Sequence, residues 1–230
     1  LQVASVYADP RDVWDPEETA SALVSVFPEL DEEAVLAKLK AKPGFVWIKR
    51  DITPRQHAAV HDLGLPGIGF RQELKRVYPN GRAAAHVVGF VDVDNKGLAG
   101  IERAIDTTLA DKVAHGEPVR LSIDLRVQHV VEDELAQTIQ TFSAIGGTGV
   151  VIDVKTGEVI AMVSAPDFDP NHVNADPAEN RFNRATLGVY EMGSTFKSFN
   201  TAMALDAGIS SKDYFDARAP IRIGRFSIRD

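Results

Sequence analysis

The chain has 230 residues, of which 44% are hydrophobic and 25% charged, a composition typical of a globular protein. Its net charge of −8 argues against nucleic acid or an anionic membrane surface as the main partner. The lack of cysteine excludes disulfides and thiolate metal sites but leaves the cellular compartment open. No signal peptide is visible, and no apolar run approaches the roughly 18–20 residues of a membrane span. We expect a fragment, because the chain begins without Met and ends in an alternating, strand-like stretch with no turn after it.

The first quarter of the chain predicts alternating strands and helices. A strand over Val3–Tyr7 precedes a helix over Pro16–Phe27. Asp31 is placed to cap a second helix, with the acidic pair after it as a solvated first turn. Residues 44–52 predict a strand, and Thr53–Gln56 is a capping box with Pro at the first helical position. The apolar face of the first helix is expected to carry Ala20, Leu23, Val24 and Phe27.

Residues 64–102 are rich in glycine and in turn signals. Within them, residues 84–91 (AAHVVGFV) predict a strand, and Gly100–Leu109 predicts a helix. Residues 114–118 (AHGEP) predict a linker, and we place a domain boundary there, between a first domain over 1–115 and a second over 116–230. Four polar or charged residues of this region could form either a buried structural network or a surface that binds a partner. We favour the network, because buried charges are usually paired. The four are Arg71, Arg76, Tyr78 and Glu102.

The second half begins with a predicted strand, Val119–Asp124, and an amphipathic helix, Leu125–Phe142. Residues 149–164 predict a hairpin whose turn needs a positive φ at Gly157. A loop follows over 166–181. The apolar residues of the amphipathic helix recur at helical spacing: Val127, Val130, Val131, Leu135, Ile139 and Phe142.

Two patterns suggest metal sites but favour ordinary surface roles. His57 and His61 are four apart on a predicted helix, and no third ligand is evident. Asp92, Asp94 and Asn95 resemble part of a calcium loop whose Glu and glycine are misplaced. No metal or organic cofactor is therefore expected.

Ser194 and Lys197 stand three residues apart in EMGSTFKSFN (191–200), on a helix expected to run to about Ala207. A chain of this length is expected to contain about one such pair by chance. Its meaning therefore depends on the residues around it.

The surroundings of this pair suit an acyl-serine mechanism. Ser194 and Lys197 lie on one helix face, where a lysine kept neutral by burial can accept the proton of a serine nucleophile. Gly193 lets a substrate approach the backbone, and free N–H groups at the helix start can stabilise an oxyanion. The burial would come from Met192, Phe196 and Phe199.

Residues 183–199 (NRATLGVYEMGSTFKSF) resemble the nucleophile segment of class B penicillin-binding proteins, the cell-wall D,D-transpeptidases. Residues 147–171 resemble the first two strands of the transpeptidase domain of that family, and residues 5–16 (SVYADPRDVWDP) resemble its division-specific members. Met192 departs from the Pro found in many members, which alters the helix start and removes no catalytic group. Residues 70–102 resemble the non-catalytic pedestal, with matches at Arg71, Arg76, Tyr78, Pro79, Gly81, His86, Gly89, Gly97, Gly100 and Glu102.

The resemblance implies an α+β fold, with a mixed α/β pedestal followed by the start of a β-lactamase-like transpeptidase domain. It implies Ser194 as the nucleophile and Lys197 as its base. The family also needs an S-x-N segment and a K-[ST]-G strand after the nucleophile. Ser198–Asn200 has the letters of the first element. However, Ser198 and Asn200 are two residues apart on one helix, so their side chains point about 200° apart and cannot both face one cleft. Lys155–Gly157 spells the second in a predicted hairpin turn, so we expect both elements beyond Asp230.

The leading hypothesis is a division-specific peptidoglycan D,D-transpeptidase at the periplasmic face of the inner membrane, with its membrane anchor outside this chain. The implied partners are peptidoglycan stem peptides, β-lactam antibiotics and, through the pedestal, the septal glycan polymerase and other division proteins. One alternative is a non-enzymatic pedestal module of the same machinery, with the fragment itself inactive. Another is a β-lactam sensor or serine β-lactamase, which would not need the pedestal.

Overall fold

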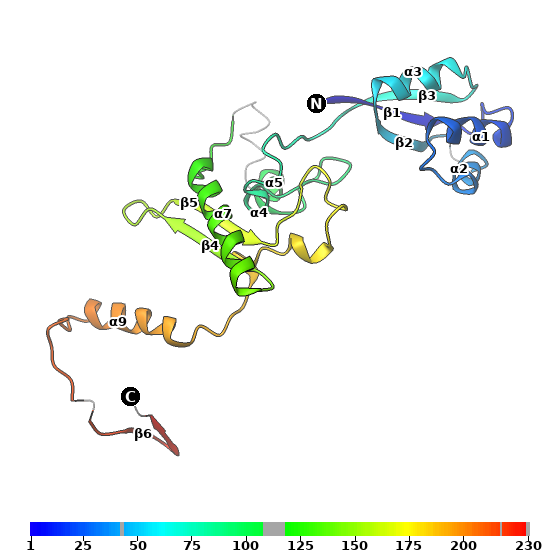
Figure 1. Ribbon diagram of the computed structural model, residues 1–230. Helices are drawn as coiled ribbons and strands as arrows, with labels where there is room; N and C mark the ends of the chain where they lie inside the picture. Colours follow the sequence, from blue (N-terminus) through cyan, green and yellow to red (C-terminus); the bar gives the residue numbers. More distant parts are fainter. Residues whose placement is uncertain (42–43, 108–117, 217, 229–230) are drawn as a thin grey trace. The chain divides into compact units, whose positions relative to one another are not determined.

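The computed structural model describes residues 1–41, 44–107, 118–216 and 218–228 (Figure 1). The chain divides into two compact units, Leu1–Leu187 and Gly188–Asp230. All the buried side chains among the described residues lie in the first unit. In this part of the chain, no helix combines the length and the apolar character needed to cross a membrane.

The first unit opens with a three-stranded antiparallel sheet in the order β2-β1-β3. Alternate residues of β1 face opposite sides of this sheet, so Val6 and Ala8 enter the core while Ser5 and Tyr7 lie on the other face. The strands are β1 (Gln2–Ala8), β2 (Val46–Ile52) and β3 (Ile68–Leu74).

Three helices complete this part: α1 (Pro16–Val26), α2 (Glu32–Leu39) and α3 (Pro54–Asp62). Two predicted caps are confirmed. The Asp31 carboxylate accepts the N–H of Ala34 at 2.8 Å, and Thr53 forms a capping box with Gln56. The apolar face of α1 is also confirmed, and it joins a core made of Val6, Ala8, Val13, Ala20, Leu23, Phe27, Val35, Leu39, Ile48, Ile52 and Val60.

An ion-pair network crosses the face of the sheet opposite this core. Arg50 of β2 donates to both carboxylate oxygens of Glu73 on β3, at 3.0 and 2.5 Å, and the buried Ser5 hydroxyl donates to the same carboxylate. Arg50 also pairs with Asp94 at 2.7 Å. The Arg50 guanidinium holds the pKa of Glu73 below its usual range. The network therefore ties the sheet to the loop that contains Asp94.

The strand predicted for residues 84–91 is wrong, because Ala85–Val88 forms the short helix α4. Ala84 takes a left-handed conformation (φ 55°) that turns the chain into this helix, and Gly89 (φ 81°) ends it. A β-carbon at Gly89 would lie 1.9 Å from the carbonyl oxygen of Ala99. The valines of this segment favour a strand, but the close approach of these backbones decides the conformation.

The helix predicted from Gly100 is confirmed as α5 (Gly100–Thr107) over its described part. Leu109, residues 114–117 of the predicted linker and the proposed domain boundary lie outside the described residues. The boundary near residue 115 therefore stays a prediction.

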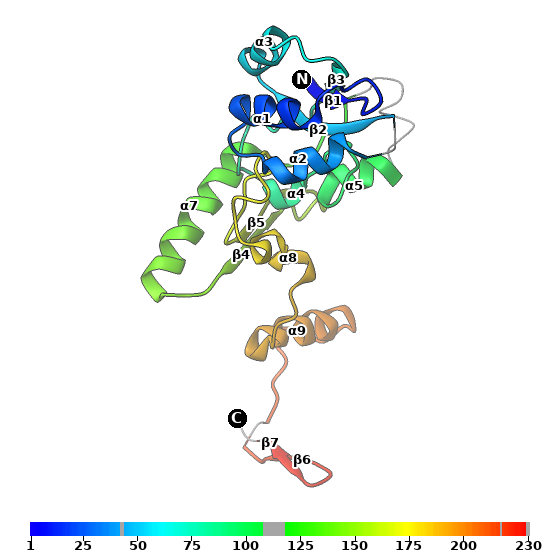
Figure 2. The ribbon, with the colours of Figure 1, turned by 90° about the vertical axis from the view of Figure 1, so that its right-hand side faces the viewer.

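The amphipathic helix is α7 (Leu125–Phe142), with the predicted limits, and it lies along the hairpin of β4 (Gly147–Ile152) and β5 (Val159–Ala165) in both ribbon views (Figures 1 and 2). The hairpin is confirmed, and Gly157 has the expected positive φ of 76° in its turn.

The strand predicted for Val119–Asp124 is wrong. Residues 118–124 contain no strand, although two hydrogen bonds hold them to β5. The Ser122 hydroxyl donates to the Val159 carbonyl at 2.7 Å, and the Asp124 N–H donates to the Ile160 carbonyl at 2.9 Å. Two bonds of this kind, one of them from a side chain, do not make a β-ladder.

Glycines of β4 receive the apolar residues of α7. A β-carbon at Gly147 would lie 2.9 Å from Leu135, and one at Gly149 would lie 2.7 Å from Val131. The rest of the predicted apolar face is not fully covered, since Val130 is 59% and Phe142 77% exposed. The helix therefore packs on the hairpin through Val131 and Leu135 and leaves part of its predicted apolar face exposed.

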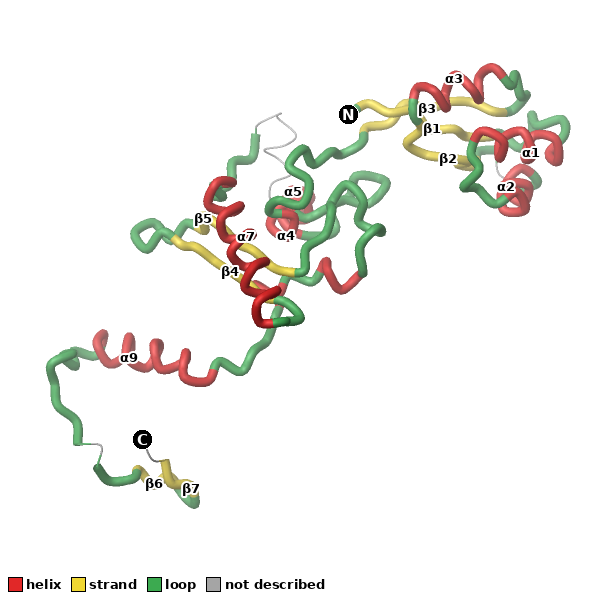
Figure 3. Tube along the Cα trace, viewed as in Figure 1, coloured by secondary structure: helices red, strands yellow, loops and turns green. Residues whose placement is uncertain are grey.

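The loop predicted after the hairpin is confirmed, with a single 3₁₀ turn, η1 (Ala178–Arg181), within it (Figure 3). The short helix α8 (Arg184–Leu187) ends the first unit. The buried Ser164 hydroxyl of β5 accepts the N–H of Arg184 at 2.9 Å, which fixes the start of α8 against the hairpin.

The second unit contains η2 (Gly193–Phe196), α9 (Lys197–Asp206), β6 (Ile221–Ile223) and β7 (Phe226–Ile228). The last helix ends near Ala207 as predicted, and Gly208 follows with a φ of 88°. The strand-like stretch at the end of the sequence is a hairpin instead, because Gly224 (φ 60°) reverses the chain between two three-residue strands.

Candidate active site

Ser194 lies on the 3₁₀ turn η2, and Lys197 is the first residue of α9. Side chains three residues apart eclipse each other in a 3₁₀ turn, so the two lie on the same side of the segment. Gly193 has a φ of 54°, which favours glycine directly before the serine. Neither η2 nor α9 has a side-chain cap. The free N–H groups expected at the helix start are partly used, because the Thr195 N–H donates to the Met192 carbonyl and the Lys197 N–H donates to the carbonyls of Ser194 and Thr195.

The expected burial of Lys197 is wrong for this structure. Phe196 and Phe199 contact each other with ring centroids 5.6 Å apart, yet they are 56% and 59% exposed, and Met192 is exposed as well. Among the described residues, no hydrogen bond joins the Ser194 hydroxyl to Lys197. The described residues of the second unit form no second layer of structure that covers these side chains, so the apolar surroundings that a neutral lysine needs are not assembled among them.

The two segments that have the letters of the S-x-N and K-[ST]-G elements lie where the sequence predicted them. Ser198–Asn200 continues along α9, on the same helix as Lys197. Lys155–Gly157 occupies the turn between β4 and β5, where Lys155 is exposed. The turn is organised by Asp153, whose carboxylate accepts the N–H groups of Lys155 and Thr156 at 2.8 and 3.1 Å. These bonds lower the pKa of Asp153.

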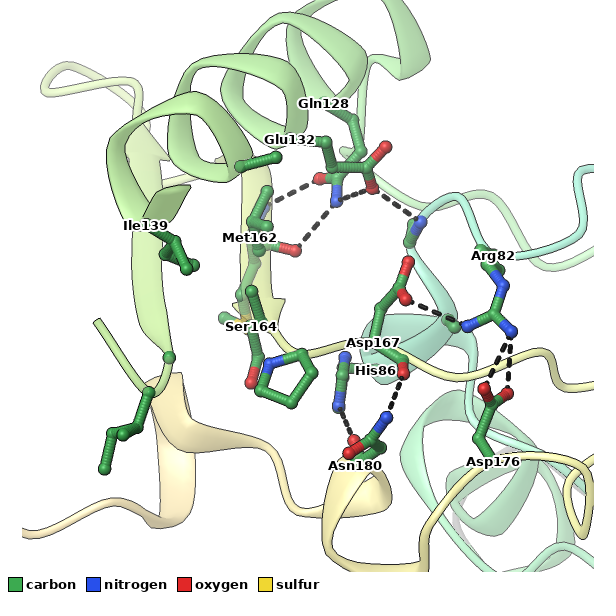
Figure 4. Close-up of a pocket in the computed structure, with 18 residues that line it drawn as sticks. Arg82, His86, Gln128, Glu132, Ile139, Met162, Ser164, Asp167, Asp176 and Asn180 are labelled. Atoms are coloured by element: carbon green, nitrogen blue, oxygen red, sulfur yellow. Dashed lines mark hydrogen bonds and ion pairs between the residues drawn. The ribbon is translucent and has the colours of Figure 1, made fainter. Parts of the chain in front are cut away.

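The first unit has a cavity of about 460 Å³ that the sequence did not predict (Figure 4). Neither Ser194 nor Lys197 lines this cavity. One part of the cavity lining is a series of polar groups joined by hydrogen bonds. The Gln128 amide bonds both to the N–H and to the carbonyl of Met162, each at 2.9 Å, and it also donates to Glu132 at 2.8 Å. Glu132 in turn accepts the N–H of Ala84 at 3.1 Å. Only one feature of the sequence could have pointed to these hydrogen bonds: Gln128 is a polar residue at a buried position on the apolar face of α7.

Arg82 forms another part of the cavity lining. Its guanidinium pairs with Asp167 at 2.9 Å and with both carboxylate oxygens of Asp176 at 2.8 Å (Figure 4). This hydrogen-bonded pairing keeps the pKa of Asp176 below its usual range. Next to it, Nε2 of the buried His86 lies 2.7 Å from the Asn180 carbonyl, and burial lowers the pKa of His86.

Two of the four residues predicted to form a structural network are paired, and a third, Tyr78, is buried with a hydroxyl that has no hydrogen-bond partner among the described residues. Arg76 and the buried Glu102 form a two-pronged ion pair at 2.9 and 3.0 Å, and Tyr78 is buried beside them. Burial raises the pKa of Tyr78. Arg71 is exposed on β3 and forms no ion pair with Glu102.

The residues singled out as weak metal patterns have other contacts. His57 stacks on Phe70 with ring centroids 3.9 Å apart. The Asp92 carboxylate accepts the N–H groups of Asp94 and Lys96, which shapes the turn. In the part of the chain that the structure describes, no group of three or more His, Asp or Glu side chains is placed to hold a metal ion.

Two protein families match the chain. Residues 1–115 match the "Penicillin-binding Protein dimerisation domain", and residues 147–226 match the "Penicillin binding protein transpeptidase domain". Ser194 and Lys197 lie inside the second match.

Curated relatives align over almost the whole chain. The "Probable peptidoglycan D,D-transpeptidase FtsI" of Caulobacter vibrioides is 43% identical over 98% of this chain and 38% of its own length. The "Probable peptidoglycan D,D-transpeptidase PenA" of Neisseria gonorrhoeae is 33% identical over 98% and 44%. The "Peptidoglycan D,D-transpeptidase FtsI" of Escherichia coli strain K12 is 31% identical over 100% and 44%. The chain therefore spans less than half the length of these relatives.

A solved structure shares the fold. The crystal structure of a peptidoglycan synthetase from Bifidobacterium adolescentis aligns with 100% of this chain and 51% of its own chain, at a TM-score of 0.59 and 20% identity. The mixed α/β architecture is therefore one that a known protein already shows.

Proposed function

The chain belongs to the penicillin-binding proteins, and on that basis we propose that the intact protein is a peptidoglycan D,D-transpeptidase of cell division. The observation that carries the proposal is the Ser194-x-x-Lys197 pair at a helix start, inside the segment that matches the transpeptidase domain. The names of the relatives in Caulobacter and Escherichia support the assignment to this reaction.

In the proposed reaction, the Ser194 hydroxyl attacks the carbonyl carbon of the penultimate D-Ala of a stem peptide, and Lys197 accepts the hydroxyl proton. The tetrahedral intermediate collapses, the terminal D-Ala leaves with a proton, and an acyl-serine ester remains. An amine of a neighbouring stem peptide then attacks this ester, which forms the cross-link and regenerates Ser194. A β-lactam acylates the same oxygen by opening its ring.

We assign residues 1–115 to the pedestal and 116–230 to the start of the transpeptidase domain. The S-x-N and K-[ST]-G elements are proposed to lie in a part of the protein outside this chain, because Ser198–Asn200 and Lys155–Gly157 are unsuitably placed. The proposed site of action is the periplasmic face of the inner membrane. Septal glycan polymerase and other division proteins are the proposed partners of the pedestal.

Labelling of the intact protein with a tagged penicillin tests the nucleophile. Peptide mass spectrometry is expected to find the adduct on Ser194, and Ser194→Ala is expected to abolish it. Lys197→Ala should slow acylation by about 10²–10⁴-fold, which is the usual effect of losing a general base.

Two matched variants serve as controls. Ser198→Ala, on the same helix, and Lys155→Ala, in the exposed turn, should each acylate within about twofold of the unmodified protein, because exposed substitutions usually change free energies by less than about 0.5 kcal/mol. An adduct on another residue, or normal labelling of Ser194→Ala, contradicts the nucleophile assignment. A large loss in Lys155→Ala would show that the turn is the K-[ST]-G element after all.

A further inference from the structure

Asn80 is the one asparagine of the sequence that is followed by glycine. Asparagine is a chemically labile residue. The backbone nitrogen of the next residue can attack its side-chain carbonyl carbon, which closes a five-membered succinimide and releases ammonia. Water then opens this ring, at one carbonyl to give aspartate and at the other to give isoaspartate. A following glycine favours the attack, because it has no β-carbon to hinder the nitrogen and its backbone adopts the required conformation easily.

The structure leaves the carboxamide of Asn80 available for this reaction. Asn80 is exposed, and its side chain makes no hydrogen bond with a described residue. A β-carbon built on Gly81 would meet nothing within 4 Å, so the space beside the attacking nitrogen is open. Several other asparagine carboxamides are held by hydrogen bonds to backbone groups: those of Asn95, Asn171, Asn180 and Asn183.

One hydrogen bond opposes the reaction. The Gly81 N–H donates to the Tyr78 carbonyl at 3.0 Å, and this turn has to open before the nitrogen can attack. The net contribution of a single hydrogen bond corresponds to a factor of about 2 to 12 in an equilibrium constant. The turn therefore slows the reaction at Asn80 but does not prevent it.

Asn80 also lies between two attachments of the loop over residues 166–181. Two positions before it, the N–H and the carbonyl of Tyr78 bond to the Asn171 amide, each at 2.9 Å. Two positions after it, Arg82 pairs with two carboxylates of the loop. Isoaspartate routes the backbone through the side-chain carbons and so adds one methylene to the chain. Because the two attachments are so close in sequence, the added length displaces at least one of them from its partners.

We propose that Asn80–Gly81 is a site of spontaneous deamidation, and that isoaspartate at this position loosens the attachment of residues 166–181 to the segment that contains it. The reaction consumes water and releases ammonia, and it needs no enzyme or cofactor. It is faster at mildly alkaline pH, because the attacking nitrogen has to lose its proton. Neither residue belongs to the Ser194 segment, so the test does not depend on the proposed function.

The chain contains a matched site for the experiment. Asn174 is also exposed, and the N–H of the residue after it, Ala175, donates to the carbonyl three positions back at 2.8 Å, as the Gly81 N–H does. The two sites thus differ chiefly in the residue that follows the asparagine. Peptide mass spectrometry of the intact, folded protein, incubated at mildly alkaline pH, is expected to show deamidation several-fold faster at Asn80 than at Asn174.

Two variants and one change of solvent sharpen this comparison. Ala175→Gly should raise the rate at Asn174 towards that of Asn80. Asn80→Gln should remove the reaction at position 80, because glutamine would have to close a less favourable six-membered ring. In concentrated urea, the rate at Asn80 should rise by about 2- to 12-fold, the factor expected for loss of the turn hydrogen bond.

Hydrogen exchange over residues 166–181 tests the structural consequence. The isoaspartate form is separated by chromatography and compared with the variant Asn80→Asp, which adds the negative charge without the extra methylene. The isoaspartate form is expected to lose amide protection in this loop, whereas Asn80→Asp should keep it.

Four outcomes overturn the proposal. Equal rates at Asn80 and Asn174 would remove the role of Gly81. An Asn80 that reacts in urea and stays intact in the folded protein would show that the turn prevents the reaction. Unchanged loop protection in the isoaspartate form would refute the loosening. An equal loss of protection in Asn80→Asp would assign the effect to charge and not to the length of the backbone.

Discussion

Two carboxamide side chains of this chain act as substitutes for a neighbouring strand. Gln128 bonds to both backbone groups of Met162, and Asn171 does the same for Tyr78. A buried backbone N–H or carbonyl without a partner costs about 1–3 kcal/mol. One amide side chain removes two such costs at once, so a single residue can seal the edge of a strand or fix a loop that has no ladder.

His86 gives a residue-scale prediction of pH dependence. A carbonyl only accepts, so Nε2 carries the proton that reaches Asn180, and burial opposes a second proton on the ring. The nearby Asp167 raises the pKa and Arg184 lowers it, but burial has the largest effect. Because the folded-state pKa lies below the unfolded value of about 6.5, the stability that neutral His86 contributes is present above pH 6.5 and is lost as the pH falls towards the lowered pKa.

The midpoint of urea unfolding is therefore expected to fall between pH 7.5 and pH 5, and His86→Gln should reduce that fall. His129→Gln, which changes an exposed histidine of α7, should leave the fall of the urea midpoint between these two pH values unchanged. An unchanged pH slope in His86→Gln would contradict this explanation.

At the scale of elements, close contact between α7 and the hairpin decides which positions of β4 must be small. Val131 and Leu135 occupy the space that side chains at Gly149 and Gly147 would need. The sequence shows two glycines in a strand, which intrinsic propensity disfavours. The packing of the helix gives the physical reason for them.

Gly149→Val is expected to destabilise the fold by about 1–3 kcal/mol through overpacking, even though valine favours strands. Thr148→Val, at the neighbouring exposed position, should have a small effect of either sign. The measurement is the denaturant midpoint of both variants under identical conditions. Equal stability of the two would show that α7 moves away from β4 at little cost.

At the scale of the whole molecule, the two edges of the hairpin differ. The outer edge of β5 is bonded by Asp124 and Gln128, whereas β4 pairs only with β5 among the described strands. Residues of β4 such as Val150 and Ile152 are exposed. A two-stranded sheet is marginally stable alone, so further strands are expected to add beside β4 and not beside β5.

The same incompleteness predicts the activity of this chain by itself. Phe196 and Phe199 are exposed, and the S-x-N and K-[ST]-G elements are proposed to lie outside this chain, so on that proposal Lys197 lacks the apolar surroundings of a neutral base in the isolated chain. Loss of one oxyanion donor alone costs about 10²–10³ in rate. We expect Ser194 in the isolated chain to acylate at least about 100-fold more slowly than in the intact protein, as measured by mass spectrometry over time. Acylation at a similar rate would refute the need for the proposed S-x-N and K-[ST]-G elements.

The sequence by itself determined what depends on near neighbours. The capping box at Thr53, the limits of α7, the turn at Gly157 and the pairing of Ser194 with Lys197 on one side follow from spacing and local hydrogen bonding. Only the tertiary structure decided that Ala85–Val88 form a helix and not part of a strand, and that Arg82, Gln128 and Asn171 clamp distant segments. The physical reason is range. A cap or a turn is closed by residues within four positions. The three side chains bond to groups more than 30 positions away, and Gly89 meets the backbone of Ala99 ten positions on, approaches that no local pattern encodes.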